Sequence, residues 1–350
     1  MKTIFNLLCV SLLLIVVGAC GTDKPTIETI KPVYVKHSAV VDLESRDILS
    51  PVYIFKIDGY IVFGNWKTTT NLFTYMSDDY TKIVNGINEG NGPGELSDFV
   101  TSQRYKNDIY MVEANTKGFD KLNFTGDSIK YERISLIDGV TTGSTFSVID
   151  NSYFLTPSLV FDNDSALLAI IGFDGKVKSI LPHPAGHPLA GTHERYVFSY
   201  FVNTRVAVSP DGKHYAYGLP VEQCFGFGDI ENGAFKNPKT LMYQTVEIDY
   251  SRLPYYILPA KGSIESTSRI VPSDEYAIFF YSGNDYFDTE KQTSNTILLF
   301  TWDGELCKKL ILDMEIMNLD FDQSTKTLYC IAQNPEACLV TYDLSEFFED

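Results

Sequence analysis

The chain has 350 residues, 44% of them hydrophobic and 13% aromatic, and its formal net charge is −17. The apolar fraction is too high for a disordered chain and is sufficient for a large core. The acidic balance argues against nucleic acid as a partner, because binding to phosphates requires a basic surface, and against electrostatic docking on anionic lipid heads.

The first thirty residues have the features of an export and anchoring segment. An apolar run from about Ile4 to Val17 is too short to span a bilayer but has the length of a signal-peptide core. It ends in VGAC, which resembles the lipobox of bacterial lipoproteins, and this resemblance implies cleavage before Cys20 and lipidation of Cys20. A plain signal peptide with a chance cysteine is the alternative. We expect a signal peptide over residues 1–19, a lipidated flexible tether over residues 20–30, and one domain over residues 31–350.

The rest of the chain is a series of short apolar strands joined by tight turns. In Thr296–Leu312, two apolar runs flank Asp303-Gly304, which is a strong hairpin signal. Similar hairpins recur earlier, and their aromatic residues Tyr75, Phe124 and Phe173 are spaced 49 residues apart. A fixed period near 50 in an all-strand chain predicts the blades of a β-propeller.

Six groups of strands are expected in chain order. They span about Ile48–Ile87, Ser97–Ile137 and Ser144–Pro182, and then start near Arg205, Ser268 and Ile316. The last group is one strand short when the chain ends, and an open strand edge is an aggregation liability. We therefore predict that Thr29–Val41 supplies the outer strand of the last blade and joins the two ends of the chain.

A family resemblance supports this arrangement. Arg205–Gly218, RVAVSPDGKHYAYG, places an S-P-D-G turn between a buried strand and an aromatic one, as in the repeat of TolB-like proteins. With NEGNGPGELSDF before it and FTWDG and MNLDFD…TLYCI after it, the chain resembles the TolB-like six-bladed β-propeller lipoproteins of Gram-negative bacteria. The resemblance covers roughly Val52 to Leu344. It implies an all-β propeller of six four-stranded antiparallel blades in the cell envelope, and it assigns no catalytic residue.

Long loops are expected on one face of such a propeller. Connections between the second and third strands of a blade, and between blades, share a face, and here they include nearly every long segment: Gly64–Asn71, Asn88–Glu95, Pro182–Tyr200, Thr245–Ser266 and Asn284–Asn295. Long loops without their own structure are usually functional or disordered. We therefore predict the binding site on this long-loop face, at the mouth of the central channel.

Four residues are candidates for ligand binding on that face. Arg205 and Arg269 each lie near the start of an inner strand, where a guanidinium could hold an anionic ligand; the alternative is a salt bridge to one of the many carboxylates. Tyr255 and Tyr256 could stack on a sugar ring or anchor a partner, although packing on a blade edge explains them equally well.

Glu95 is the last residue of the glycine-rich segment Gly90–Glu95, which could be interpreted as a phosphate-binding loop. The segment lacks the lysine and the strand-to-helix context of a P-loop. We interpret it as a tight crossing between blades and keep Glu95 as a candidate ligand-binding residue.

Metal sites have weaker support. Four potential ligands fall within twelve residues: His183, His187, His193 and Glu194. Their spacing matches no rigid zinc motif, so a solvated polar loop is the alternative. Asp162–Ser165 and Asp285–Asp288 offer oxygen atoms to calcium but lack the full calcium-loop pattern. No cofactor is expected, with zinc or calcium as the open alternatives.

The four cysteines of the domain show no C-x-x-C pair; they are Cys224, Cys307, Cys330 and Cys338. Register counting does not place Cys330 opposite Cys338, so we expect free thiols that pack as small apolar residues.

Motifs for nucleophilic catalysis are missing: the sequence has no G-x-S-x-G and no H-E-x-x-H. The first hypothesis is therefore a non-catalytic binding or assembly module of the Gram-negative cell envelope. It is held to a membrane by its lipid alone, and its partner is an envelope protein or glycan. The alternative is an envelope hydrolase or lyase that acts on a glycan or peptide in the channel with acidic residues as acid and base.

Overall fold

The structure, a computed structural model, describes residues 26–65, 71–90, 92, 95–96, 99–113, 118–125, 128–136, 145–157, 166–185, 203–245, 247–249, 251, 258–288 and 293–348. The predicted signal peptide and Cys20 lie outside these residues. The described residues form β-strands and two short 3-10 helices, η1 (Glu44–Arg46) and η2 (Ser345–Phe347). Within these ranges, no helix has the length and apolar character needed to cross a membrane.

Four antiparallel sheets of four strands follow one another along the chain, and the strands of each pair in sequence order. The first contains β3 (Pro51–Ile57), β4 (Tyr60–Asn65), β5 (Phe73–Ser77) and β6 (Ile83–Asn85). The second contains β7 (Phe99–Tyr105), β8 (Asp108–Glu113), β9 (Gly118–Thr125) and β10 (Ser128–Leu136). The third contains β11 (Ser147–Val148), β12 (Tyr153–Pro157), β13 (Ala166–Gly172) and β14 (Val177–Pro182). The fourth contains β15 (Arg205–Val208), β16 (His214–Gly218), β17 (Gln223–Glu231) and β18 (Ala234–Gln244).

These sheets match the first four predicted groups of strands. Tyr75 and Phe124 lie on the third strands β5 and β9, and Phe173 directly follows the third strand β13. The period of 49 residues therefore marks equivalent places in successive sheets. Between the fourth sheet and the next one, β19 (Ile248–Asp249) and β20 (Leu258–Pro259) form a two-stranded sheet.

The C-terminal part of the chain forms one larger sheet with two N-terminal strands. Its members are β21 (Thr267–Pro272), β22 (Tyr276–Tyr281), β23 (Ser294–Thr301), β24 (Leu306–Asp322), β25 (Thr327–Gln333), β26 (Ala337–Asp343), β1 (Pro32–Val35) and β2 (Ala39–Asp42). The predicted hairpin of Thr296–Leu312 is the β23–β24 pair. Its turn contains Gly304 with a φ of 75°, a backbone conformation that glycine adopts without strain.

The strand β24 differs from the prediction. A new strand was expected to start near Ile316, but β24 runs unbroken for 17 residues. Its first half pairs with β23 and its second half, from Ile316, pairs with β25. The segment between Leu312 and Asn318 contains no glycine or proline. The chain therefore passes from one pairing to the next without a turn.

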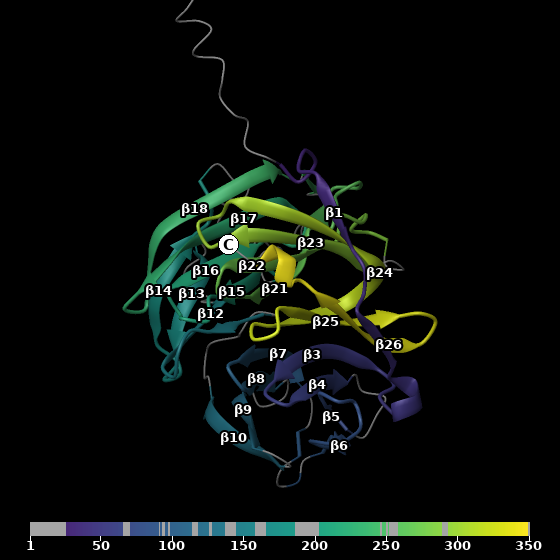
Figure 1. The fold of residues 1–350 in the computed structure, drawn as a ribbon. Helices are drawn as coiled ribbons and strands as arrows, with labels where there is room; N and C mark the ends of the chain where they lie inside the picture. Colours follow the sequence, from purple (N-terminus) through teal and green to yellow (C-terminus); the bar gives the residue numbers. More distant parts are fainter. Residues whose placement is uncertain are drawn as a thin grey trace, which may run out of the picture.

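The predicted N-terminal donor strand is observed in part. Ala39–Asp42 forms β2, which pairs antiparallel with β26, so the two ends of the described chain lie in one sheet. The preceding strand β1 takes a different place, because it pairs in parallel with the first half of β24, from Pro32 opposite Lys309 to Val35 opposite Leu312. Figure 1 shows β1 in purple running beside β24.

The expectation of a flexible tether up to residue 30 is wrong for its last five residues. Thr26–Ile30 forms a turn in which the amide of Ile30 donates to the carbonyl of Thr26 over 2.9 Å. Ile27 is only 2% exposed because it packs among apolar residues of β15–β17 and β21–β24. Burial of an isoleucine side chain contributes roughly 1.5–3 kcal/mol, which holds this turn on the fold.

The hydrophobic core is divided into layers between neighbouring sheets. Each of the first four sheets shares an apolar cluster with the next sheet along the chain, and a further cluster lies between the two halves of the large sheet. The ring closes where Ile54, Ile61 and Phe63 of the first sheet pack on Ile331 and Leu339 of β25 and β26. Because each sheet is covered on both faces, its central strands are nearly continuous apolar runs. The chain is thus an all-β propeller with four-stranded antiparallel blades (Figure 1).

Candidate functional site

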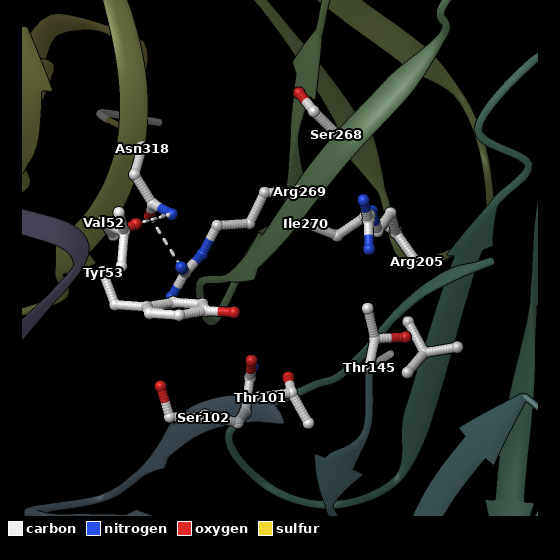
Figure 2. A pocket seen from close by; sticks show the side chains of 12 residues that line it. Val52, Tyr53, Thr101, Ser102, Thr145, Arg205, Ser268, Arg269, Ile270 and Asn318 are labelled. Carbon is white, nitrogen blue, oxygen red and sulfur yellow. Dashed lines mark hydrogen bonds between the residues drawn. The ribbon is translucent and has the colours of Figure 1, made fainter. Parts of the chain in front are cut away.

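A cavity of about 220 Å³ lies on the central axis, where the innermost strands of the sheets converge. Its lining comes from β3, β7, β15, β21 and β24 and from Thr145, which lies just before β11. The residues are Val52, Tyr53, Thr101, Ser102, Gln103, Thr145, Arg205, Val206, Ser268, Arg269, Ile270 and Asn318 (Figure 2). Most of them lie near the starts of their strands, where the connections between sheets arrive. The cavity therefore belongs to the face on which the long loops were predicted.

Arg205 is the first residue of β15 and pairs with Gly218 of β16. A Cβ atom at Gly218 would lie 2.4 Å from Oγ1 of Thr267 on β21, so the glycine allows the two sheets to approach closely. Among the described residues, no hydrogen bond or ion pair reaches the Arg205 guanidinium, and its buried Nε has no partner. Burial lowers the pKa of Arg205, and the charges of Tyr53 and Glu265 offset this effect only in part.

Arg269 approaches the cavity from β21 and is held in place by neighbours. Its Nη1 donates a hydrogen bond of 2.6 Å to Oδ1 of Asn318, while Nδ2 of Asn318 donates one of 2.8 Å to the carbonyl of Val52. The guanidinium carbon lies 5.4 Å from the ring centre of Phe55 and 6.0 Å from that of Tyr53, within the range of cation–π attraction. Its buried Nε has no hydrogen-bond partner among the described residues. Burial lowers the pKa of Arg269, and the charge of Asp320 offsets this effect only in part; the charges of Arg104 and Arg205 lower the pKa further.

Hydroxyl groups face the two arginines across the cavity (Figure 2). Ser102 is 3% exposed, and its Oγ has no hydrogen-bond partner within the described ranges. Thr145 donates a hydrogen bond of 2.6 Å to the carbonyl of Thr204. The cavity thus presents guanidinium donors on one side and small hydroxyls on the other.

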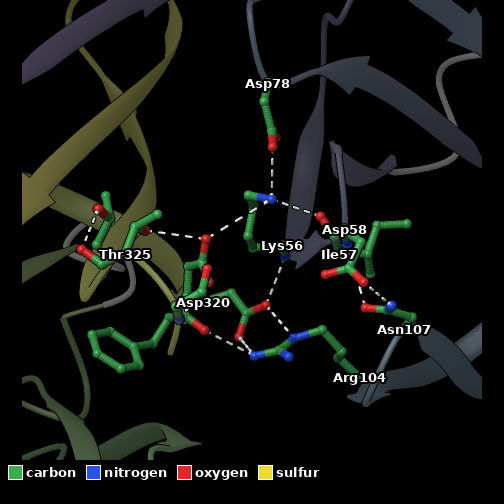
Figure 3. A network of polar contacts seen from close by, with 12 residues as sticks. Lys56, Ile57, Asp58, Asp78, Arg104, Asn107, Asp320 and Thr325 are labelled. Carbon is green, nitrogen blue, oxygen red and sulfur yellow. Dashed lines mark hydrogen bonds and ion pairs between the residues drawn. The ribbon is translucent and has the colours of Figure 1, made fainter.

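A second cavity of about 120 Å³ continues the channel towards the ends of the inner strands and shares Gln103 and Arg269 with the first. Arg104 and Asp320 form an ion pair in its lining. Arg104 donates to both carboxylate oxygens of Asp320, from Nε over 2.7 Å and from Nη2 over 3.1 Å. The amide of Lys56 donates to the same carboxylate over 2.7 Å (Figure 3). Burial would lower the pKa of Arg104, but the charge of Asp320 raises it above its ordinary value.

The amino group of Lys56 extends this network beside the second cavity. It donates to the carbonyl of Ile57 over 2.6 Å and to Asp78 over 3.0 Å, and it lies 4.0 Å from Asp322 (Figure 3). These contacts join β3 and the segment after β5 to β24. The network therefore ties the first sheet to the C-terminal one, where the ring closes.

The structure brings together two of the predicted ligand-binding residues. Arg205 and Arg269 are 64 positions apart in the sequence and line the same cavity. The alternative of a salt bridge does not hold for Arg205 among the described residues. Glu95 is not in the cavity lining; its carboxylate accepts a hydrogen bond of 2.8 Å from the amide of Gly92 within its own loop. Tyr255 and Tyr256 lie outside the described residues.

The proposed metal ligands are mostly outside the described residues as well: His187, His193, Glu194 and Asp162–Ser165. His183 is described and follows β14. Asp285 accepts a hydrogen bond of 2.9 Å from the amide of Phe287, as in an ordinary turn. Within the described ranges, no group of three or more histidine, cysteine or acidic residues is placed to hold a metal ion. Cys330 lies opposite Val340 and not opposite Cys338, as counted from the sequence, and all four cysteines of the domain are free thiols.

Sequence reasoning missed most of the cavity lining, including Tyr53, Thr101, Ser102 and Asn318. A signal for them was present, because Tyr53, Thr101 and Arg269 are each the third residue of an inner strand. Aligning the six strand groups by the start of their first strand would have placed these side chains at one level of the channel.

No protein-family model and no curated protein matches the chain. Among solved structures, it is similar to the β-propeller domain of Myceliophteria thermophila Cps50 (Swd1), with 7% sequence identity and a TM-score of 0.42. The similarity covers 88% of this chain and 99% of that one. A similarity with so low a sequence identity and TM-score says nothing about function, so the functional interpretation depends on the geometry of the cavity.

Proposed function

We propose that the protein is a non-catalytic binding module whose ligand occupies the central cavity on the long-loop face of the propeller. The observation that carries this proposal is the cavity where the inner strands converge, with Arg205 and Arg269 turned into it. A propeller is also a common scaffold for binding, because its loops surround one axis. The fold alone does not distinguish binding from catalysis, so the chemistry of the cavity decides.

That chemistry favours binding over the alternative of a hydrolase or lyase. Acid–base catalysis requires a titratable group within hydrogen-bond reach of the reacting atoms. The described residues that line the cavity include arginine, serine, threonine and asparagine, but no carboxylate, imidazole or thiol. They can hold and orient a ligand, and besides the two arginines the titratable group among them is the phenol of Tyr53.

We also propose that the propeller has six blades, as in the TolB-like lipoproteins that the sequence resembles. In this interpretation the large sheet contains two blades: β21, β22, β23 and the first half of β24, followed by the second half of β24 with β25, β26 and β2. The apolar cluster between these halves supports the division, because it resembles the clusters between the separate sheets.

Deletion of residues 29–41 tests this arrangement. The deletion leaves the edge of β26 unpaired and exposes apolar surface on β24, so the truncated chain is expected to melt at a clearly lower temperature. A truncated protein that melts at the parental temperature would contradict a last blade completed by the N-terminal strand.

The lipobox-like sequence before Cys20 motivates a location in the Gram-negative cell envelope, with the lipid as the membrane anchor. The ligand or partner is then an envelope protein or glycan that reaches the long-loop face. Mass spectrometry of the mature N-terminus tests the anchor. A diacylated or triacylated Cys20 supports it, and an unmodified chain with a different first residue excludes it.

Thermal-shift screening of soluble envelope components tests the binding function. Val52 lines the cavity and is partly buried, so Val52→Trp should fill the site while other surfaces stay intact. A compound that stabilises the wild type, fails to stabilise Val52→Trp, and is recovered unchanged supports the proposal. Stabilisation of both proteins would place the site elsewhere, and chemical conversion of the compound would favour an enzyme.

A further inference from the structure

The charge of the central cavity is opposite to that of the chain. The sequence contains 45 acidic and 28 basic residues, yet the described lining of the cavity holds two arginines and no acidic residue. Burying a cation without a counter-charge costs free energy, and this cost is normally avoided by pairing. Arg104, in the same channel, follows that rule through Asp320, whereas no carboxylate of the described residues forms an ion pair with Arg205.

We propose that Arg205 and Arg269 bind an anionic oxygen group, a carboxylate or a phosphate, of the ligand in the central cavity. The inference rests on the proposed binding function and names the chemical class of its ligand. A guanidinium keeps its charge in proteins and carries five N–H donors in a planar fork, which suits the oxygens of either group.

The two arginines are prepared for this role in different ways. Arg269 is oriented by Asn318 and by the rings of Tyr53 and Phe55, and these contacts use only part of its donor set. Arg205 enters from a neighbouring sheet and has its donors free among the described residues (Figure 2). A site whose donors are already held in place loses less entropy on binding.

Ser102 provides a third, independent indication of a polar ligand. Its hydroxyl is buried on the opposite wall of the cavity and has no hydrogen-bond partner among the described residues. A buried hydroxyl without a hydrogen bond is unfavourable, so a conformation of this kind is expected at a site that receives a polar group. A ligand oxygen held by the arginines would also accept a hydrogen bond from the Ser102 hydroxyl.

The size of the cavity limits what enters it. Its volume of about 220 Å³ is below the roughly 300–1,000 Å³ that is usual for sites enclosing a drug-sized molecule. It suits a small anion or the anionic end of a longer molecule, with the remainder on the long-loop face.

Isothermal titration calorimetry of the full chain, with inorganic phosphate and separately with acetate at low ionic strength, tests the inference. We expect saturable binding of at least one probe, and the stronger probe identifies the group. Arg205→Gln and Arg269→Gln should each weaken binding at least tenfold, because each removes charge-assisted hydrogen bonds. Arg205→Lys, which keeps the charge and loses the fork, should give an intermediate value. Lys176→Gln removes one charge from an exposed turn, where the side chain is 76% accessible, and should leave binding unchanged.

Melting curves of each variant show whether it is folded before titration. Absence of heat with either probe at millimolar concentration in the wild type would overturn the anion site, as would equal binding by Arg205→Gln and the wild type. A further outcome separates the binding function of the cavity from the anionic character of its ligand. A neutral ligand that is blocked by Val52→Trp and unaffected by Arg205→Gln would preserve the cavity as a binding site and refute its anionic ligand.

Discussion

The two ends of the central channel contain the same type of residue in opposite electrostatic states. At the end formed where the inner strands finish, Arg104 is fixed by two hydrogen bonds to Asp320, and its pKa is raised. At the end formed where they begin, Arg205 has no partner among the described residues, and burial lowers its pKa. Both arginines are enclosed by the same propeller, so burial alone does not explain the difference.

The difference separates a structural role from a binding role. The Arg104–Asp320 pair, together with Lys56, links the first two sheets to the C-terminal sheet where the ring closes. Among the described residues, Arg205 makes no such link at the other end, and its charge carries an electrostatic cost that an anionic ligand would relieve. Substitutions at the two ends test this division.

Asp320→Ala should be strongly destabilising. Asp320 is 3% exposed, and its removal leaves the largely buried Arg104 guanidinium without its counter-charge, with the carbonyl of Phe321 as its remaining acceptor, so we expect a loss of about 3–5 kcal/mol in the free energy of unfolding by urea denaturation. Asp78→Ala is the control, because Asp78 also contacts Lys56 but is 46% exposed, and its loss should cost less than about 1 kcal/mol. Equal losses in the two variants would contradict a structural role for the buried pair.

Arg205→Met should have the opposite effect and stabilise the protein. The variant removes a partly buried charge that has no carboxylate partner among the described residues, and it keeps a side chain of similar length, so without added anion the free energy of unfolding should rise by about 1–2 kcal/mol. Arg104→Met is the matched control: the same chemical change at the other end leaves Asp320 unpaired and should destabilise the fold. If both variants lose stability to a similar extent, the two ends do not differ as described.

The stability of the fold at acidic pH tests the end of the channel that contains the Arg104–Asp320 pair, and the expected effect is smaller. Burial would raise the pKa of Asp322, but hydrogen bonds from Ser324 and the charge of Lys56 outweigh it, so the pKa is lowered on folding. A lowered pKa contributes stability that is present above the unfolded value near about pH 4 and is lost as the pH falls through the folded value.

Asp322→Asn should therefore lose less stability than the wild type between about pH 5 and pH 2, by an amount on the order of 1 kcal/mol. Urea denaturation at a series of pH values measures it, with the exposed Asp303→Asn as the control. Parallel pH profiles for the wild type and Asp322→Asn would show that this carboxylate is not part of the stabilising network.

Tyr53→Leu should have the smallest effect, and only on binding. The ring of Tyr53 attracts the Arg269 guanidinium at 6.0 Å, which is worth about 0.5–1 kcal/mol. Losing this orientation should weaken phosphate or acetate binding about two- to fivefold in calorimetry. Tyr153→Leu removes a similar contact with Lys178, at 5.6 Å, outside the cavity, and should leave the affinity unchanged. A larger loss in Tyr153→Leu would indicate a general effect on the fold.

Much of the fold was predictable because its units are local hairpins. Turns such as Asp58-Gly59 and Asp303-Gly304 mark the sheets, and the spacing of Tyr75, Phe124 and Phe173 gives their period. The continuous strand β24 was missed because strand groups were divided by period, although no turn residue separates them. The parallel pairing of β1 with β24 depends on contact between residues almost 280 positions apart, for which the sequence contains no local signal.

The presence of Arg205 and Arg269 at the central channel was predictable, and their pairing was not. Arg205 and Arg269 stand at the starts of inner strands, which placed them at the channel. Whether each has a carboxylate partner could not be read from a chain with 45 acidic residues, because pairing depends on the three-dimensional neighbours. Arg104, which has a carboxylate partner, and Arg205, which has none in the described part of the chain, look alike in the sequence.

Anomalous diffraction from a crystal grown with selenate, a stand-in for phosphate and sulfate, tests the division most directly. We expect a selenium peak in the central cavity, within hydrogen-bond reach of the Arg205 and Arg269 guanidinium groups, and none beside the paired Arg104. Selenate bound only to surface lysines, with neither arginine of the cavity in contact, would contradict it.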